Sequence, residues 1–256
     1  MFWPWSRARH ASEADAISIS GAERSRRRAL PCRTPPPARY ARLHARFLRL
    51  AGGEAEAALE AALVMLLRPR LRVLDAGCGP GTIARRLKAQ EPRIDLTLVD
   101  KDPQMLSQCH DIGGRPLLGT LENLPLRDGS VDVATAFWSI ETLADPYAGL
   151  RELLRVTRPG GWIAIAFCAR EGAVDWLDRC IRLGIALRGS GRMLAPTRVR
   201  CDLTRAGSGD IRQLHCRGPA RALIARKQCE QVAQPRHMGK PRIGQTRKQF
   251  ACRGDA

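Results

Sequence analysis

Residues 73–82 read VLDAGCGPGT and place three glycines at alternate positions behind an apolar run and an aspartate. Glycine loses more conformational entropy on folding than other residues, so this cluster indicates backbone that bends tightly or lies close to another group. The preceding residues, LRVLDA (71–76), have the continuous apolar character of a buried strand. The following residues, TIARRLKAQ (82–90), are typical of a helix, so the turn joins a strand to a helix.

The same alternation of strand and helix continues along the chain. Apolar runs predict strands over 94–100, 115–120, 130–138 and 162–169, and amphipathic stretches predict helices over 102–110 and 145–157. Such alternation is typical of an α/β fold, a Rossmann-like doubly wound sheet that is mostly parallel with helices on both faces. Beyond residue 170 the pattern predicts a helix over 174–188. Two runs joined by a short turn, 211–216 and 221–227, predict an antiparallel last strand.

Composition divides the chain into one domain with two flanking segments. Residues 1–37 are basic and aperiodic, which predicts a disordered N-terminal segment, and residues 229–256 predict a disordered basic tail. Between them, residues 38–228 are expected to form a single domain. Within it, two helices over 38–67, separated where Gly52 and Gly53 stop the first apolar pattern, form a helical cap. Residues 71–169 form its core.

Charge and cysteine content limit the classes of function. The net charge is +18, but the excess lies in the two flanks and the core is nearly neutral, which favours solvated basic flanks over a polyanion-binding role. Nine cysteines without a C-x-x-C pair favour reduced thiols and predict no metal site. No apolar run approaches the roughly 20 residues of a membrane span, and no secretory signal precedes the domain, which predicts a cytoplasmic protein.

The glycine turn is predicted to bind a ligand at the carboxyl edge of the sheet, where open α/β folds hold their ligands. A dinucleotide fingerprint would need glycine at position 82, which is Thr82, and the lysine of a phosphate-binding P-loop is absent. Asp75 precedes the turn and would repel a pyrophosphate, whereas it suits a ligand with a positive centre. Asp100 ends the second strand, where a carboxylate can accept hydrogen bonds from both hydroxyls of a ribose.

Several further segments carry a family resemblance: residues 119–136, 143–161 and 162–169 as well as the glycine turn and the second strand. The stretch from Val73 to Cys168 resembles the class I S-adenosylmethionine-dependent methyltransferases, in the quinone C-methyltransferase-like subgroup with a type 11 methyltransferase domain. The resemblance implies S-adenosylmethionine as the cofactor, and Phe137 or Trp138 near the departing methyl group. The cofactor-binding residues that it implies are Asp75, Gly77, Gly79, Gly81, Asp100, Thr120, Leu121, Glu122 and Phe137.

Two positions bear on binding and catalysis. Relatives carry an aspartate for the adenine amino group where this chain has Thr120, which weakens the expected hold on the adenine. Methyl transfer is an in-line displacement that depends mainly on alignment, so no catalytic triad is required. If a base is needed, Glu141 is the first candidate, ahead of His110 and Asp145.

Three functions stay open at this point. The first is a methyltransferase acting on a small-molecule acceptor, which the helices over 38–67 and 173–187 would cover. The second is an RNA- or polyanion-directed methyltransferase that uses the basic flanks for positioning. The third is a non-catalytic cofactor-binding protein. The segment FWSIETL (137–143) lacks the Asn/Asp-Pro-Pro-Tyr arrangement used on exocyclic amines and amides, which disfavours those acceptors.

Overall fold

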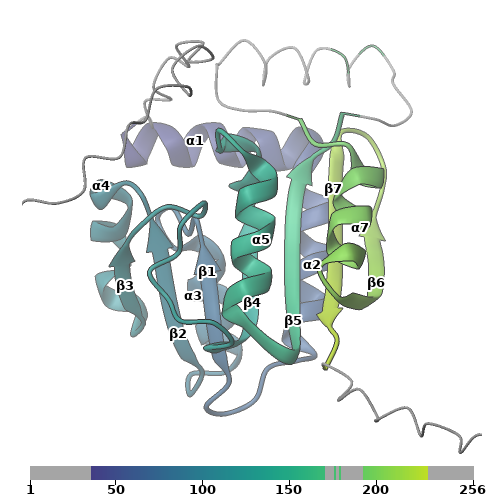
Figure 1. The fold of residues 1–256 in the computed structure, drawn as a ribbon. Helices are drawn as coiled ribbons and strands as arrows, with labels where there is room; N and C mark the ends of the chain where they lie inside the picture. The colour runs from purple at the N-terminus through teal and green to yellow at the C-terminus, as the bar shows by residue number, and fades with distance from the viewer. Residues whose placement is uncertain (1–35, 171–175, 177–178, 180–192, 230–256) are drawn as a thin grey trace, which may run out of the picture.

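A computed structural model of the chain describes residues 36–170, 176, 179 and 193–229. Its centre is a seven-stranded sheet with the strand order β3-β2-β1-β4-β5-β7-β6 (Figure 1). The first five strands are parallel, β7 runs antiparallel to β5, and β6 runs antiparallel to β7. The predicted Rossmann-like sheet and its antiparallel last strand are therefore confirmed. The strands are β1 (Arg72–Ala76), β2 (Asp95–Asp100), β3 (Arg115–Leu118), β4 (Val131–Phe137), β5 (Thr157–Cys168), β6 (Ser208–His215) and β7 (Ala220–Lys227).

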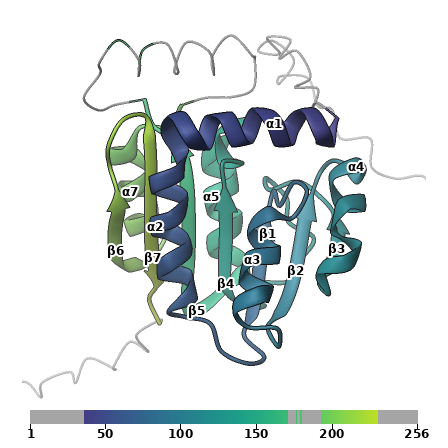
Figure 2. The same ribbon diagram turned by 180° about the vertical axis from the view of Figure 1, so that it is seen from behind.

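Helices cover both faces of this sheet. In Figure 1, α5 (Pro146–Val156) and α7 (Pro196–Arg205) lie in front of the strands; α2 (Gly53–Val64) and α3 (Thr82–Gln90) lie behind them, as Figure 2 shows from the other side. Helix α1 (Pro37–Phe47) crosses the carboxyl ends of the strands instead of packing on a face. The shorter elements are α4 (Pro103–Leu106), η1 (Leu48–Gly52), η2 (Ser107–Ile112) and η3 (Ile140–Thr142). Among the described residues, no helix is both long and apolar enough to cross a membrane.

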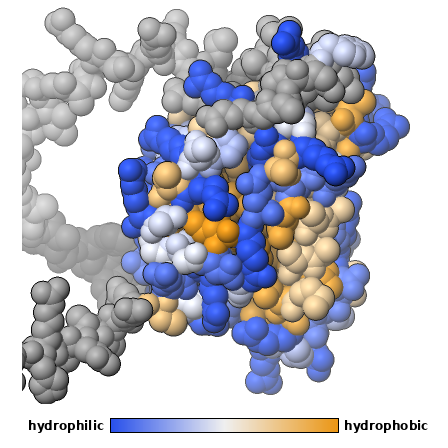
Figure 3. All heavy atoms as spheres, turned by 90° about the vertical axis from the view of Figure 1, so that its right-hand side faces the viewer, coloured by the Kyte–Doolittle hydropathy of each residue, from blue (hydrophilic) through white to orange (hydrophobic). Residues whose placement is uncertain are grey.

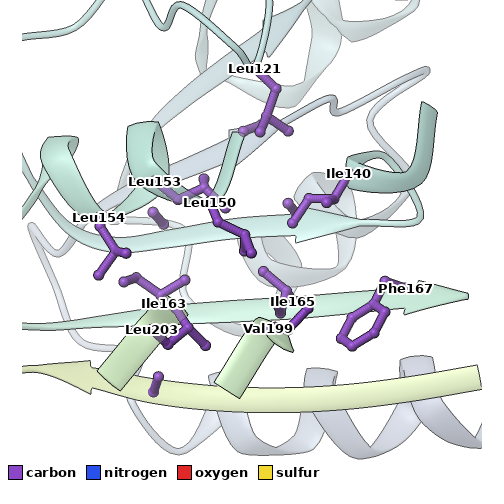
Figure 4. Close-up of a cluster of buried hydrophobic side chains, with 14 of the residues drawn as sticks. Leu121, Ile140, Leu150, Leu153, Leu154, Ile163, Ile165, Phe167, Val199 and Leu203 are labelled. Atoms are coloured by element: carbon purple, nitrogen blue, oxygen red, sulfur yellow. The ribbon is translucent and has the colours of Figure 1, made fainter. Parts of the chain in front are cut away.

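Two apolar clusters hold the layers together. On the front face, leucines of α5 spaced three and four residues apart pack on β5, and α7 adds Val199 and Leu203 (Figure 4). On the rear face, Leu59 and Leu63 of α2 and Leu87 of α3 pack against the other side of the sheet. Strands β1, β4 and β5 are apolar on both sides because each of their faces is covered by helices.

Strand β6 forms the edge of the sheet next to the antiparallel strand β7. Most β6 side chains are exposed or half-buried, and Figure 3, which views the molecule from this edge, shows hydrophilic side chains interleaved with hydrophobic ones. Asp210 and Arg212 of β6 form an ion pair with a 3.0 Å separation. Charged side chains on an edge strand oppose pairing with strands of other chains.

The structure differs from the predicted elements in four places. The chain stays helical through Gly52 and Gly53, because the π-helical turn η1 joins α1 to α2; a Cβ atom at Gly52 would lie 2.4 Å from the Phe47 ring. Strand β5 begins at Thr157, five residues earlier than expected, after an irregular register between β4 and β5. The predicted helix over 102–110 is four residues of α-helix followed by η2. Helix α7 was not predicted at all.

Other predicted segments fall largely outside the described residues. Of the predicted helix over 174–188, only Trp176 and Arg179 are described, and both are helical. The two segments expected to be disordered, 1–37 and 229–256, are likewise described only at 36–37 and 229.

An ion-pair cluster joins three strands at the amino end of the sheet. The Asp132 carboxylate on β4 accepts hydrogen bonds from the backbone amide and guanidinium of Arg72 on β1, at 2.9–3.1 Å, and from Arg158 on β5. Burial alone would raise the pKa of Asp132, but the hydrogen bonds from Arg72 and Arg158 outweigh it and hold the pKa well below its usual range. The carboxylate therefore stabilises the fold above the pKa of an unfolded aspartate, about 3.9, and this contribution is lost as the pH falls below it.

We expect Asp132→Asn to lower the free energy of unfolding by roughly 1–3 kcal/mol at pH 7, since the amide cannot accept from all three donors and loses its charge. Urea unfolding followed by circular dichroism measures this change. Asp95→Asn, on the exposed start of β2, is the control and should change stability little. Equal stability of the two variants would contradict a role for the cluster.

Candidate functional site

The glycine turn after β1 adopts backbone conformations that favour glycine. Gly77, Gly79 and Gly81 have φ values of +70°, +54° and +78°. A Cβ atom at Gly77 would lie 2.4 Å from the Ser139 side chain, and one at Gly81 would lie 2.3 Å from Ile112. At these two positions glycine is therefore required by packing inside the protein as well as by φ. A Cβ atom at Gly79 would meet only the Tyr40 ring, at 3.6–3.8 Å, so Gly79 faces the space below α1.

A carboxylate at the end of β2 fixes the turn. The Gly79 amide donates to Oδ2 of Asp100 at 2.8 Å, and the Asp102 amide donates to Oδ1 at 2.9 Å. Burial raises the pKa of Asp100, and these two amide hydrogen bonds oppose the effect. Each carboxylate oxygen has a second lone pair, so Asp100 can still accept from a ligand while it holds the turn.

Two buried carboxyl groups lie at the same edge of the sheet. Asp75 at the end of β1 is 2% exposed and Glu141 in η3 is 5% exposed, and Oδ2 of Asp75 and Oε2 of Glu141 have no hydrogen-bond partner. Burial raises the pKa of each to about 7. A hydrogen bond from Thr135 lowers the pKa of Asp75 in part, and one from Cys168 does the same for Glu141. A buried carboxylate oxygen without a partner is costly, so both groups are suited to a cationic ligand.

Tyr40 of α1 lies over the glycine turn and among the acidic groups. Burial raises the pKa of its phenol well above the usual range, and four acidic side chains around it raise the pKa further. These side chains are Asp100, Glu141, Glu56 and Asp75. Helix α1 therefore brings a phenol hydroxyl to the one place where the carboxyl ends of β1 and β2 and the residues after β4 meet.

A third buried carboxylate, Glu56 of α2, holds the elements around this place together. Its Oε2 accepts from the Trp138 indole at 2.8 Å, its Oε1 accepts from Arg86 of α3 at 2.9 Å, and His44 of α1 lies 3.6 Å away. Burial would raise the pKa of Glu56, but the hydrogen bonds with His44 and Trp138 outweigh it and lower the pKa. Glu56 thus has partners for both oxygens, unlike Asp75 and Glu141.

Aromatic rings continue the cover from α1 to β4. The Tyr40 and His44 rings are stacked with centroids 5.6 Å apart, and the Phe47 ring meets the Trp138 ring edge-on at 4.8 Å. Trp138 has a φ of +54°, which is rare for a bulky side chain. Phe137, its neighbour, is buried in the rear apolar cluster.

The loop after β3 contacts the glycine turn through Leu121. Leu121 is buried, and its side chain would lie 3.8 Å from a Cβ atom at Gly77. Thr120 is exposed. Glu122 points to the start of α5, where its Oε1 accepts from the Asp145 amide at 2.7 Å.

The two remaining candidate bases have other surroundings. The Asp145 carboxylate accepts from the Tyr147 amide at 3.0 Å, so it caps α5, and it pairs with Arg151. His110 is exposed in η2. Of the three candidates, Glu141 is the one that is buried beside Tyr40.

A cavity of about 560 Å³ opens beyond the end of β5, between the start of α5 and the start of α7. Its lining combines two arginines with apolar and aromatic side chains. The Arg198 guanidinium lies 4.0 Å from the centre of the Tyr147 ring. The lining residues are Asp145, Pro146, Tyr147, Arg170, Met193, Leu194 and Arg198.

Sequence reasoning did not identify Tyr40, His44 or Glu56 as parts of the site. Tyr40 belongs to the apolar spacing of α1 and was interpreted as a packing residue, since no motif marks it. One feature of the sequence could have indicated this site. Glu56 lies on an alanine-rich helix, and a carboxylate on a largely buried helix needs partners. Across the described part of the chain, no three His, Cys, Asp or Glu side chains gather as metal ligands would.

Comparison with known proteins finds likenesses over the central part of the chain. Residues 74–165 match the family model described as a methyltransferase domain. The chain is 34% identical over 125 residues to the biotin biosynthesis bifunctional protein BioCD of Bordetella avium, covering 48% of this chain and 27% of that protein. It is 36% identical over 111 residues to the malonyl-[acyl-carrier protein] O-methyltransferase of Pectobacterium atrosepticum, covering 43% of each. The chain thus spans less than half the length of these curated relatives.

Solved structures share the fold over more of the chain. A methyltransferase structure from Thermotoga maritima matches with a TM-score of 0.57 at 23% identity, covering 74% of this chain and 97% of that one. A chain from the complex between the Haloferax volcanii Trm112 methyltransferase activator and a methyltransferase matches with a TM-score of 0.61 at 18% identity, covering 77% and 99%. At these identities the likeness concerns the fold. Residues 74–165 thus match a methyltransferase domain, and the glycine turn and the strand order give this part of the chain a Rossmann-like fold that solved methyltransferase structures share.

Proposed function

We propose that the chain is an S-adenosylmethionine-dependent methyltransferase that acts on a small-molecule acceptor with an anionic group. The observation that carries the cofactor assignment is the pair of buried carboxyl groups, Asp75 and Glu141, each with one oxygen lacking a partner. S-adenosylmethionine has a sulfonium and an ammonium group, and both charges suit this place. NAD and ATP would bring phosphates toward the same carboxylates.

The residues of the edge fit the parts of this cofactor. Asp100 has free lone pairs for the ribose hydroxyls, and on its α1 side the Gly79 backbone is covered by the Tyr40 side chain, which would have to shift to admit a ligand. Leu121 offers an apolar surface beside the turn, suited to one face of the adenine, with Thr120 as a neutral acceptor nearby. Glu122 is less suited to the adenine, because its carboxylate already accepts a hydrogen bond from the Asp145 amide before α5.

When bound, the cofactor supplies a methyl group activated on a positively charged sulfur, and the protein aligns the acceptor with it. Helix α1 and the Tyr40 ring exclude water from the turn, and the carboxylates stabilise the positive charge until transfer. In this proposal Glu141, which is 5% exposed, would accept a proton from a hydroxyl or acidic carbon. A carboxylate acceptor would already be ionised and would need no base.

The cavity beyond β5 supports an anionic acceptor. It adjoins the edge of the sheet that holds Glu141 and Cys168, and Arg170 and Arg198 line it. Guanidinium groups bind carboxylates and phosphates through paired hydrogen bonds. A relative at 36% identity is named for an acyl-carrier-protein-bound malonyl group, which carries a carboxylate. The same arginines leave an RNA- or polyanion-directed enzyme as the second candidate, and a non-catalytic cofactor-binding protein as the third.

Asp100→Ala tests the cofactor site. We expect it to weaken binding of S-adenosylhomocysteine by roughly 10- to 100-fold, because loss of a charged acceptor costs about 1.5–3 kcal/mol. Titration calorimetry gives the dissociation constants. Asp95→Ala, at the other end of β2, is the matched control and should bind as the natural chain does. Binding of NAD in preference to S-adenosylhomocysteine, or equal affinity of the two variants, would refute the assignment.

The pH dependence of affinity tests the two carboxyl groups. Below about pH 7 both are largely protonated in the free protein, and a cationic ligand favours their ionised forms, so binding releases protons. We expect the affinity for S-adenosylmethionine to rise between pH 5.5 and 7 by up to about tenfold per unit for each group, and to level off above pH 8. Asp75→Asn and Glu141→Gln should each flatten the profile, whereas Asp95→Asn should keep it. A flat profile for the natural chain would rule out this role.

Arg198→Gln tests the acceptor cavity. Small-molecule fractions that an anion exchanger retains should yield labelled product when they are incubated with the protein and cofactor labelled on its methyl group. The variant should reduce labelling at limiting acceptor by about tenfold, through KM, while S-adenosylhomocysteine binding stays unchanged. Arg205→Gln, an exposed arginine at the far end of α7, is the control. Labelling of RNA instead, lost at high salt, would favour the polyanion-directed enzyme.

A further inference from the structure

Two thiols converge on the glycine turn. Cys78 lies within the turn, between Gly77 and Gly79, and Cys109 lies in η2, which packs beside it. The Sγ atoms of Cys78 and Cys109 are each 3.5 Å from the carbonyl oxygen of Gly79, so the two thiols meet at one acceptor. The methyl-transfer function leaves both of them without a role.

The surroundings of the pair favour reaction at Cys109. The neighbouring Cys78 thiol and the cationic side chain of Arg85 lower the pKa of Cys109. Burial and the carboxylates of Asp75 and Asp100 oppose this, and the pKa stays below its usual value. A thiolate is the nucleophilic form of cysteine. Cys78 is 9% exposed and Cys109 is 1% exposed, so bulky reagents are excluded and the pair is a target only for an oxidant as small as hydrogen peroxide.

We propose that Cys78 and Cys109 form a disulfide upon oxidation by a peroxide, and that this disulfide and the bound cofactor exclude each other. The second part rests on the proposed function. In the first step the Cys109 thiolate attacks a peroxide oxygen, the O–O bond breaks, and a sulfenic acid and hydroxide form. In the second step the Cys78 sulfur displaces the sulfenic hydroxyl as water after losing its proton. Overall, two thiols and one hydrogen peroxide give one disulfide and two waters, with two electrons passing from sulfur to oxygen.

The disulfide would change the turn on which the cofactor site depends. A disulfide has no thiol proton, so neither sulfur could still donate to the Gly79 carbonyl, and its fixed bond length and dihedral angle would constrain the turn. The amide of the same residue donates to Asp100, which links the thiol pair to the carboxylate assigned to the ribose. Since coupling between two equilibria is reciprocal, bound cofactor should also slow formation of the disulfide.

The test uses the full chain, reduced and then treated with hydrogen peroxide. Non-reducing peptide mapping by mass spectrometry should find Cys78 linked to Cys109, and calorimetry should show S-adenosylhomocysteine binding weakened at least tenfold, restored by dithiothreitol. In Cys109→Ser, peroxide should leave the affinity of that variant unchanged relative to its own untreated form. Cys201→Ser, an exposed cysteine on α7, is the control and should respond to peroxide as the natural chain does.

The outcomes separate the two parts. Absence of the Cys78–Cys109 peptide, or oxidation of either residue only to sulfinic or sulfonic acid, overturns the disulfide. A linked peptide with unchanged affinity overturns the exclusion of cofactor. If the reduced chain does not bind S-adenosylhomocysteine, the proposed function and the exclusion both fail, whereas the linked peptide still decides the disulfide, because mass spectrometry needs no ligand.

Discussion

The hydrogen bond from the Gly79 amide to the Asp100 carboxylate joins the ends of two adjacent strands, and the arrangement of the site depends on it. It fixes the turn after β1 against β2, while Gly77 donates to the carbonyl of Val99 at 2.7 Å. The turn then directs α3 behind the sheet, with Gly81 as its N-terminal cap residue. Because β1 lies between β2 and β4 in the sheet, the chain leaves β1 at the point where the strand order reverses. Open α/β sheets bind ligands at such points, since adjacent connections diverge there.

The parts of the fold that could be predicted are those encoded locally. Residues 71–76 and 94–100 were predicted as strands, and β1 and β2 occupy 72–76 and 95–100, because continuous apolar runs bounded by turns mark buried strands. Asp102 and Asp145 cap α4 and α5 through their carboxylates, as Asp-Pro pairs indicate. Helix α7 was missed because only Val199 and Leu203 mark its buried face among polar and basic residues. The sequence features that could have predicted α7 are Pro196 in its first turn and the two apolar residues that lie four positions apart.

The parts of the site that could not be predicted depend on tertiary placement. The residues of the turn lie in one motif, but Tyr40 is brought to Gly79 only by the path of α1 across the strand ends. That path is set by the tight packing of Phe47 on Gly52 at the π-helical turn and by the contact of Phe47 with Trp138. The roles of Gly77 and Gly81 also differ from the expectation of ligand contact alone, since Ser139 and Ile112 occupy the space that their side chains would need.

Three buried carboxyl groups at one edge of the sheet differ in how completely the protein hydrogen-bonds them. All three are at most 5% exposed. Glu56 has Trp138 and Arg86 as partners for its two oxygens, so its pKa is lowered and its charge is stabilised by the protein itself. Asp75 and Glu141 each lack a partner for one oxygen, and burial raises their pKa to about 7. In the free protein their charges are therefore destabilised near neutral pH. Under the proposed function, a cation bound beside them would supply the interaction that Glu56 obtains from Arg86.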